Sequence, residues 1–290
     1  TGFEEFDRMT GGLKPAESII IAARPSMGKT SFMMNVVENI CLDQGKPTLV
    51  FSAEMSQKSI ISRLAYSRAK FDIKLLSRGY IPKKQELQRI RQAFTDVRQS
   101  PLIIEDQSAP TIDQIRARAR REKRKKGIEL IAIDYLQLCR SFSKQAIGSR
   151  EREIAEISAG IKGLAKDLGI PILILAQLNR DADKRGGKIK GKPQMSDLRE
   201  SGSIEQDADV IGFLHRPSQY AEDDEEKEKL AGFAQLILAK NRNGPTGFVP
   251  LTFVETLMRF ETGAPWTEEG EPENRKKASE QPKKDWFHGH

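Results

Sequence analysis

Residues 18–30 read SIIIAARPSMGKT, and this stretch decides the fold. Its first part is a continuous apolar run, which is typical of a strand buried on both faces. From Ala23 to Thr30 it matches the phosphate-loop pattern G-x-x-x-x-G-K-[ST], with Ala23 in place of the first glycine. We expect a helix over 30–43, so the loop would join a strand to a helix N-terminus. Backbone N–H groups at such a point bind anions, so the stretch predicts a phosphate site rather than a chance GKT turn.

Apolar strands separated by helical segments continue along the chain. Continuous Ile/Leu/Val strands split by helices are typical of a parallel sheet covered on both faces, so the sequence predicts an α/β fold. After Ala208 the strands follow one another directly, with a turn at Asn243-Gly244-Pro245, which predicts an antiparallel extension of that sheet. The expected strands are 48–52, 102–105, 130–134, 172–176, 210–214, 234–239, 248–253 and 258–260, and the expected helices are 57–69, 84–97, 111–125 and 150–168.

The composition describes a globular chain with a basic balance. Its 290 residues include 48 Lys and Arg against 41 Asp and Glu, a formal net charge of +7. Two cysteines are too few for a disulfide framework, which favours a reducing, cytoplasmic location. No stretch has the ~18 apolar residues that a membrane span needs, so no membrane association is expected. We expect one folded domain over 1–266 and a disordered polar tail over 267–290.

Polar side chains follow the predicted strands that neighbour the phosphate loop. Lys29 is suited to bind the β- and γ-phosphates. The Thr30 hydroxyl and the Asp134 carboxylate are suited to bind Mg²⁺. Glu54 is placed to polarise an attacking water, and Gln177 to sense the γ-phosphate. Glu54 or Gln177 alone would be an ordinary loop residue, but all lie at the carboxyl ends of strands, where open α/β sheets bind ligands. The sequence therefore predicts a site for ATP or another nucleoside triphosphate with Mg²⁺, lined by Ser26, Met27, Gly28, Lys29, Thr30, Ser31 and Asp134.

Two basic segments stand apart from this site. Residues 116–126 read RARARREKRKK, which indicates either a solvated helix face or a surface for a phosphate backbone. Lys240 and Arg242 flank a tight turn between late strands. An arginine supplied by a neighbouring subunit can neutralise charge on a γ-phosphate, and a hairpin far from its own phosphate loop could act in that way. The alternative for this hairpin is a solvent-exposed basic turn.

Together these motifs resemble the RecA-like ATPase domain of bacterial replicative helicases of the DnaB type. The similarity extends from Thr1 to about Phe260. A recombinase or a clock-type ATPase would share the phosphate loop but not both of the motifs DLRESGSIEQDAD at 197–209 and KNRNGPTG at 240–247. The resemblance is carried by TGF at 1–3 with Asp7, ARPSMGKT at 23–30, SAEMS at 52–56, IDYLQL at 133–138, AQLNR at 176–180, DLRESGSIEQDAD at 197–209 and KNRNGPTG at 240–247.

The resemblance implies a hexameric motor that hydrolyses nucleoside triphosphate and moves 5′ to 3′ on single-stranded DNA to unwind duplex at the replication fork. It implies that Glu54 is the catalytic base, that Arg63 belongs to the nucleotide site and that Gln177 is the γ-phosphate sensor. Lys240 and Arg242 would act on the neighbouring subunit. The DNA backbone would be held by a central loop containing Arg199, Glu200 and Gly202, although Ser201-Gly202-Ser203 would also suit a helix cap.

Family members carry an N-terminal domain and a linker helix ahead of this region, and the similarity here begins at Thr1. This indicates a fragment of a longer protein. We expect it to bind nucleotide without assembling into a ring, and to hydrolyse nucleotide only when it assembles. In the full-length family, primase and a helicase loader are further partners. Two rival functions stay open: a strand-exchange recombinase of the same fold, and a nucleotide-dependent interaction module with negligible turnover.

Overall fold

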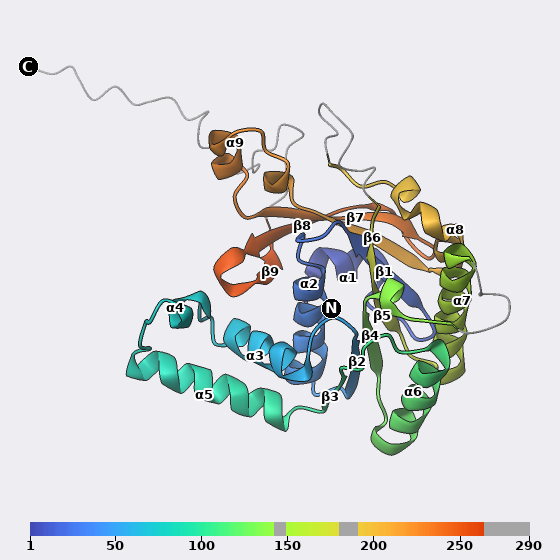
Figure 1. The fold of residues 1–290 in the computed structure, drawn as a ribbon, viewed down its shortest axis with the longest axis horizontal. Coiled ribbons are helices and arrows are strands. Elements are labelled where there is room, and N and C mark those ends of the chain that lie inside the picture. Colours follow the sequence, from blue (N-terminus) through green and yellow to red (C-terminus); the bar gives the residue numbers. More distant parts are fainter. Residues whose placement is uncertain (142–148, 180–190, 264–290) are drawn as a thin grey trace, which may run out of the picture.

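A twisted sheet runs through the centre of the protein, as seen in a computed structural model that describes residues 1–141, 149–179 and 191–263 (Figure 1). The strand order in the described chain is β3-β2-β4-β5-β1-β6-β7-β8-β9. Pairing is parallel from β3 to β6 and antiparallel from β6 to β9. The strands are β1 Ser18–Ala23, β2 Thr48–Ser52, β3 Leu102–Glu105, β4 Leu130–Asp134, β5 Ile172–Gln177, β6 Val210–His215, β7 Phe233–Asn241, β8 Gly247–Val254 and β9 Arg259–Thr262.

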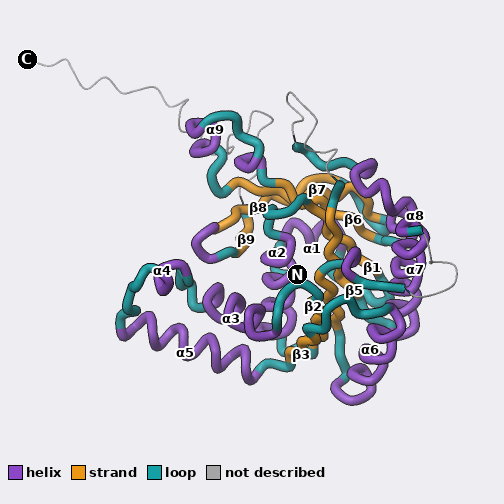
Figure 2. Tube along the Cα trace, viewed as in Figure 1, coloured by secondary structure: helices purple, strands orange, loops and turns teal. Residues whose placement is uncertain are grey.

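Helices cover both faces of the sheet because alternate strand residues point to opposite sides (Figures 1 and 2). Ile19 and Ile21 pack in the same core as α1, α2, α3 and α5. Ile20 and Ala22 face the other core, formed with α6, α7 and α8. The α-helices are α1 Glu4–Thr10, α2 Lys29–Val37, α3 Gln57–Arg68, α4 Lys74–Ser77, α5 Lys84–Gln99, α6 Ile112–Lys126, α7 Arg150–Leu168, α8 Gly202–Asp207 and α9 Asp224–Lys229.

The predicted α/β fold with an antiparallel extension is confirmed, and each expected strand is present to within two residues at either end. Three details differ. The helix expected over 30–43 is divided between α2 and a π-helical turn, Glu38–Asp43. The strand expected over 210–214 is not purely antiparallel, because β6 pairs parallel with β1 and antiparallel with β7. The short helices α1, α4 and α9 were not predicted. The tail proposed for 267–290 lies outside the described residues.

The basic run in 116–126 forms most of α6, which ends at Gly127 in the left-handed conformation. Arg118 pairs with Glu105, and Arg120 pairs with Asp167 at 2.8 Å. The last turn carries Lys123, Arg124, Lys125 and Lys126, where positive charge is favoured by the helix dipole. These contacts support the interpretation of α6 as a solvated surface helix whose arginines fasten neighbouring elements.

Both cysteines, Cys41 and Cys139, are buried as free thiols. No helix within the described ranges is long and apolar enough to cross a membrane.

His215, the last residue of β6, is buried and stacks on Tyr220 with ring centroids 5.7 Å apart. Burial lowers the pKa of His215 to about 4, with a smaller effect of the Lys192 charge. The unfolded chain therefore binds a proton between pH 6.5 and about 4 that the folded chain does not, so stability is complete above pH 6.5 and falls as the pH drops towards 4.

We expect His215→Leu to remove much of this pH dependence, which amounts to about 3 kcal/mol for a shift of this size. The measurement is the free energy of urea unfolding at about pH 7.5 and about pH 4.5 for both chains. The variant should lose less stability between the two pH values than the unaltered chain. Parallel losses in both chains would contradict the assignment.

Candidate nucleotide-binding site

The phosphate loop follows β1 and leads into α2. Ala23 is the last residue of β1 and does not have a positive φ, so alanine is tolerated where the pattern has glycine. Ser26 and Gly28 adopt left-handed conformations, with φ of 66° and 93°. α2 begins with no side-chain cap and no acidic residue in its first turn. Its first N–H groups are therefore left for an anion, as the sequence predicts.

Lys29 folds back over the loop that it follows. Its Nζ donates hydrogen bonds to the carbonyl oxygens of Ala23 at 3.2 Å and Arg24 at 3.5 Å. Burial lowers the pKa of Lys29, and the charges of Asp134 and Glu54 oppose that shift. A cation held by two neutral carbonyls in a buried position would gain a stronger partner in a phosphate.

Thr30 and Asp134 meet across the sheet edge. The Thr30 hydroxyl donates a 2.8 Å hydrogen bond to Asp134 Oδ2. Asp134 Oδ1 is buried without a hydrogen-bond partner in the described chain, and so is the Ser31 hydroxyl. Burial raises the pKa of Asp134, whereas the Thr30 hydrogen bond and the Lys29 charge oppose the rise. An orphaned carboxylate oxygen beside a hydroxyl is a donor set that suits Mg²⁺ and its water ligands, so these residues fit the predicted ion.

We expect Asp134→Asn to weaken the Mg²⁺ dependence of nucleotide binding by about tenfold, ~1.4 kcal/mol, because an amide does not supply the negative charge. In the unaltered chain, Mg²⁺ affinity should begin to fall at a higher pH than an ordinary aspartate would give, because the pKa of Asp134 is raised by burial. Calorimetric titration of ADP at several Mg²⁺ concentrations measures both effects. An Asn variant with unchanged Mg²⁺ dependence would contradict the assignment.

Three further predicted residues lie around this edge. Glu54 is exposed after β2, and its charge acts on both Lys29 and Asp134. Arg63 is half-buried on α3, and its charge acts on Asp134. Gln177 ends β5 directly beside Ala23 in the parallel register. The phosphate-loop residues, Glu54, Arg63, Asp134 and Gln177 are therefore gathered where the parallel strands end, whereas Lys240 and Arg242 are not.

Two neighbours of the loop were missed by sequence reasoning. The Gln137 side chain accepts from the Gln177 N–H at 3.1 Å and donates to the Gln177 carbonyl at 3.0 Å, which fixes the end of β5. Arg24 donates to the Leu178 carbonyl at 2.9 Å and joins the loop to the segment after β5. These contacts link positions far apart in the chain, and no local spacing signals them.

The basic hairpin lies at the opposite end of the central strands, near the start of β1 rather than near the phosphate loop. Arg242 contacts Asp209 Oδ1 and the Gln206 carbonyl, both at 3.3 Å, and Lys240 donates to the Glu205 carbonyl. Asp209 also accepts from the N–H of Ser18, the first residue of β1, whereas the phosphate loop follows the last. Six strand residues span about 20 Å, so Arg242 and the loop of one chain are separated by the length of a strand.

Asp209 holds this hairpin in place. Burial would raise the pKa of Asp209, but hydrogen bonds from Lys162 and from the Ser18 amide, with the charges of Lys162 and Arg242, keep it below its usual value. The carboxylate is therefore ionised and paired with two cations, Lys162 and Arg242.

The proposed DNA loop forms a 3-10 helix, Met195–Ser201, that continues into α8. The side chains of Arg199 and Glu200 lie outside the described part of the structure. Gly202 has a right-handed helical backbone and open space where a Cβ would project. The segment leads directly to the α8 carbonyls that hold Lys240 and Arg242.

Strand β1, the phosphate loop and α2, with the Asp134 carboxylate at the end of β4 in the same parallel sheet, define a P-loop protein of RecA-like fold. The family model of the DnaB-like helicase C terminal domain matches residues 1–262. The chain belongs to this family.

Named relatives and solved structures agree with this assignment. The replicative DNA helicase DnaB of Haemophilus influenzae is 44% identical over 265 residues, covering 90% of this chain and 54% of that protein. The corresponding helicase of Geobacillus stearothermophilus is 38% identical, covering 90% and 55%. A DnaB-like replicative helicase, solved in a study of its interactions with primase, superposes with a TM-score of 0.81 at 35% identity and covers 89% of this chain and 62% of its own. A separately solved ATPase domain has the same TM-score and identity and covers 89% of both chains. The chain thus spans about half the length of the DnaB relatives.

Proposed function

We propose that this chain is the motor domain of a replicative DNA helicase, which hydrolyses ATP or another nucleoside triphosphate with Mg²⁺ at interfaces between subunits. The observation that carries the proposal is the separation of the phosphate loop from the basic hairpin, which we infer to be two halves of one site between subunits. The phosphate loop, Thr30 and Asp134 occupy one edge of the sheet, whereas Lys240 and Arg242 occupy the other.

In this proposal the phosphate loop and Lys29 bind the phosphates. Thr30 and Asp134 would hold Mg²⁺, which would neutralise negative charge on the phosphates. Glu54 orients a water and accepts its proton as the water oxygen bonds to the γ-phosphorus, while the β–γ bridging oxygen leaves with ADP. Gln177 senses the γ-phosphate, and Arg63 adds positive charge on the α3 side.

Arg242 and Lys240 complete the site of the next subunit. A contact between opposite edges of identical chains is head-to-tail, and it closes into a ring when the rotation between subunits permits. We propose a hexameric ring on this basis, with single-stranded DNA bound by the segment that contains Arg199, Glu200 and Gly202. Movement of that segment would reach Arg242 and Lys240 through α8.

A primase and a helicase loader are the proposed partners of the whole protein, and the cytoplasm is its proposed location. Retention of both Glu54 and Arg242 argues against the rival interaction module, because a pure binder needs neither group. A recombinase of the same fold is the second rival; it would pair homologous DNA, whereas a helicase separates a forked duplex.

The test is the steady-state ATP hydrolysis rate as a function of protein concentration, with and without unstructured single-stranded DNA. A rate per subunit that rises cooperatively with concentration, and rises further with DNA, supports the proposal. A rate that is independent of concentration in a chain that hydrolyses ATP would show that each subunit has a complete site, and would reject the interface model.

A further inference from the structure

The phosphate loop rests on aromatic rings from the last strands. A Cβ on Gly28 would lie 3.0 Å from the ring of Phe260 and 3.3 Å from the ring of Phe253, so the loop backbone lies directly against these two side chains. Phe253 is the last buried residue of β8, and Phe260 lies in β9. Their ring centroids are 4.7 Å apart. We call these two rings the aromatic floor.

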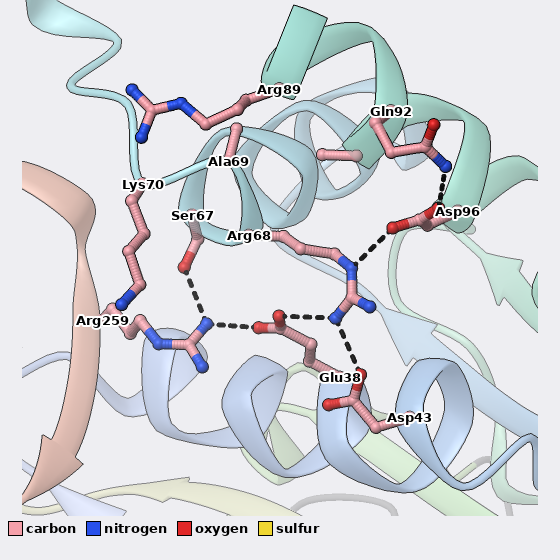
Figure 3. Close-up of a pocket in the computed structure, with 11 residues that line it drawn as sticks. Glu38, Asp43, Ser67, Arg68, Ala69, Lys70, Arg89, Gln92, Asp96 and Arg259 are labelled. Carbon is pink, nitrogen blue, oxygen red and sulfur yellow. Dashed lines mark hydrogen bonds and ion pairs between the residues drawn. The ribbon is translucent and has the colours of Figure 1, made fainter. Parts of the chain in front are cut away.

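This floor is fastened to the helix that the loop begins. The Phe260 N–H donates a 2.8 Å hydrogen bond to Asn35 Oδ1 on α2. Arg259 pairs with Glu38 and contacts the Ser67 hydroxyl, and Glu38 also pairs with Arg68, as Figure 3 shows. The position of the floor relative to α2 is therefore fixed by both a neutral hydrogen bond and a charged network.

Arg216 contacts both the floor and the loop. Its side chain comes from the segment just after β6, the residue is 7% exposed, and the guanidinium carbon lies 3.9 Å from the centre of the Phe253 ring. Its NH1 donates to the Ser26 carbonyl at 3.3 Å, and its Nε is buried without a partner among the described residues. In the described chain it forms no ion pair with a carboxylate. Burial lowers the pKa of Arg216, and the Glu255 charge offsets this only in part.

A buried cation without an anion is costly, so its position calls for a functional reason. The Ser26 carbonyl shares a planar trans peptide with the Met27 N–H, and in such a peptide the two groups point in opposite directions. A donor such as Arg216 that holds the Ser26 carbonyl on the side of the aromatic floor therefore turns the Met27 N–H towards the opposite side, where a phosphate would bind. Within the described ranges, the Met27 N–H makes only a long hydrogen bond, 3.5 Å, to the Arg24 carbonyl.

We propose that Arg216 is a positioning residue of the nucleotide site: from behind the loop it holds the left-handed Ser26 and directs the Met27 N–H at a bound diphosphate. This inference rests on the proposed nucleotide function. Backbone N–H groups of such loops contact the α- and β-phosphates. Arg216 should therefore strengthen the binding of ADP and of ATP to the same extent. This distinguishes it from Glu54, Gln177 and Arg242, which are assigned to the γ-phosphate.

The test is calorimetric titration of Arg216→Gln and Arg216→Lys with MgADP and with a non-hydrolysable ATP analogue. We expect Gln to raise both Kd values about tenfold, which corresponds to ~1.4 kcal/mol. Lys should raise both about threefold, because it retains the charge but not the planar stack on Phe253. In steady-state hydrolysis, KM should rise with little change in kcat. Thermal unfolding without nucleotide establishes that each variant is folded.

The matched control is Arg118→Gln, which removes a partly buried guanidinium paired with Glu105 and Glu122 on the other face of the sheet. It should lower the melting temperature without changing either Kd. A folded Arg216 variant that binds MgADP as tightly as the unaltered chain overturns the inference, and so does a loss confined to the ATP analogue. If the unaltered chain binds neither nucleotide, the proposed function itself fails.

Discussion

Arg242→Ala is expected to lower kcat for ATP hydrolysis about 10³-fold or more, the usual contribution of an arginine that acts on a γ-phosphate from a neighbouring subunit. Nucleotide affinity should change little, because Arg242 lies at the sheet edge opposite its own phosphate loop. The measurement is steady-state hydrolysis at a protein concentration where the unaltered chain is assembled, with light scattering to verify assembly. Arg120→Ala is a suitable control, since it removes an exposed arginine of α6 that pairs with Asp167 of α7, and it should leave kcat unchanged.

A mixing experiment separates action on a neighbour from action within one chain. Glu54→Ala and Arg242→Ala would each be inactive alone, but a mixed assembly contains some interfaces with an intact Glu54 facing an intact Arg242. Activity should therefore return on mixing. If the two variants co-assemble and no activity returns, Arg242 does not act on the neighbouring subunit.

Glu54→Gln is expected to lower kcat by about 10²- to 10⁴-fold, because the amide accepts no proton from the attacking water. Glu54 is exposed and is coupled to Lys29 and Asp134 through charge alone, so the change should not disturb the fold. ATP should stay bound for long periods, and its affinity should be retained or slightly increased. Single-turnover hydrolysis with radiolabelled ATP measures the step directly.

Glu54→Asp provides the matched control for this prediction. It keeps the carboxylate but shortens its reach, so partial activity is expected. A Gln variant that hydrolyses ATP as fast as the unaltered chain would exclude Glu54 as the base.

The central strands were predictable because their sequences admit few alternatives. IIIAA in β1 and LIAID in β4 are short apolar runs between polar turns, and the structure buries every one of their residues. The short helices were not predictable for the opposite reason. α9 reads DEEKEK, has no buried residue and offers no apolar periodicity, so its helical form depends on the Asp223 cap. The parallel pairing of β6 is likewise a property of the chain path rather than of its own residues.

The residues of the candidate site likewise divide into those that were predictable from the sequence and those that were not. The proximity of Thr30 and Asp134 was predictable, because both positions follow from the rule that ligands bind at the carboxyl ends of parallel strands. The contact between Arg216 and Ser26 joins residues 190 positions apart and has no motif. Asp209 and Gln137 are similar cases, since each supports a predicted residue from a distant segment. Sequence patterns identify groups that touch a ligand, whereas the groups that hold them are set by packing.

The aromatic floor beneath Gly28 has a consequence for folding during synthesis on the ribosome. Synthesis runs from the N-terminus, so the phosphate loop emerges well before Phe253 and Phe260, on which it rests. A nascent chain that has already formed β1 and α2 still lacks the support on which its loop rests. We therefore expect affinity for nucleotide to arise only after β9 has been made, so that nascent chains that lack β9 do not compete for ATP.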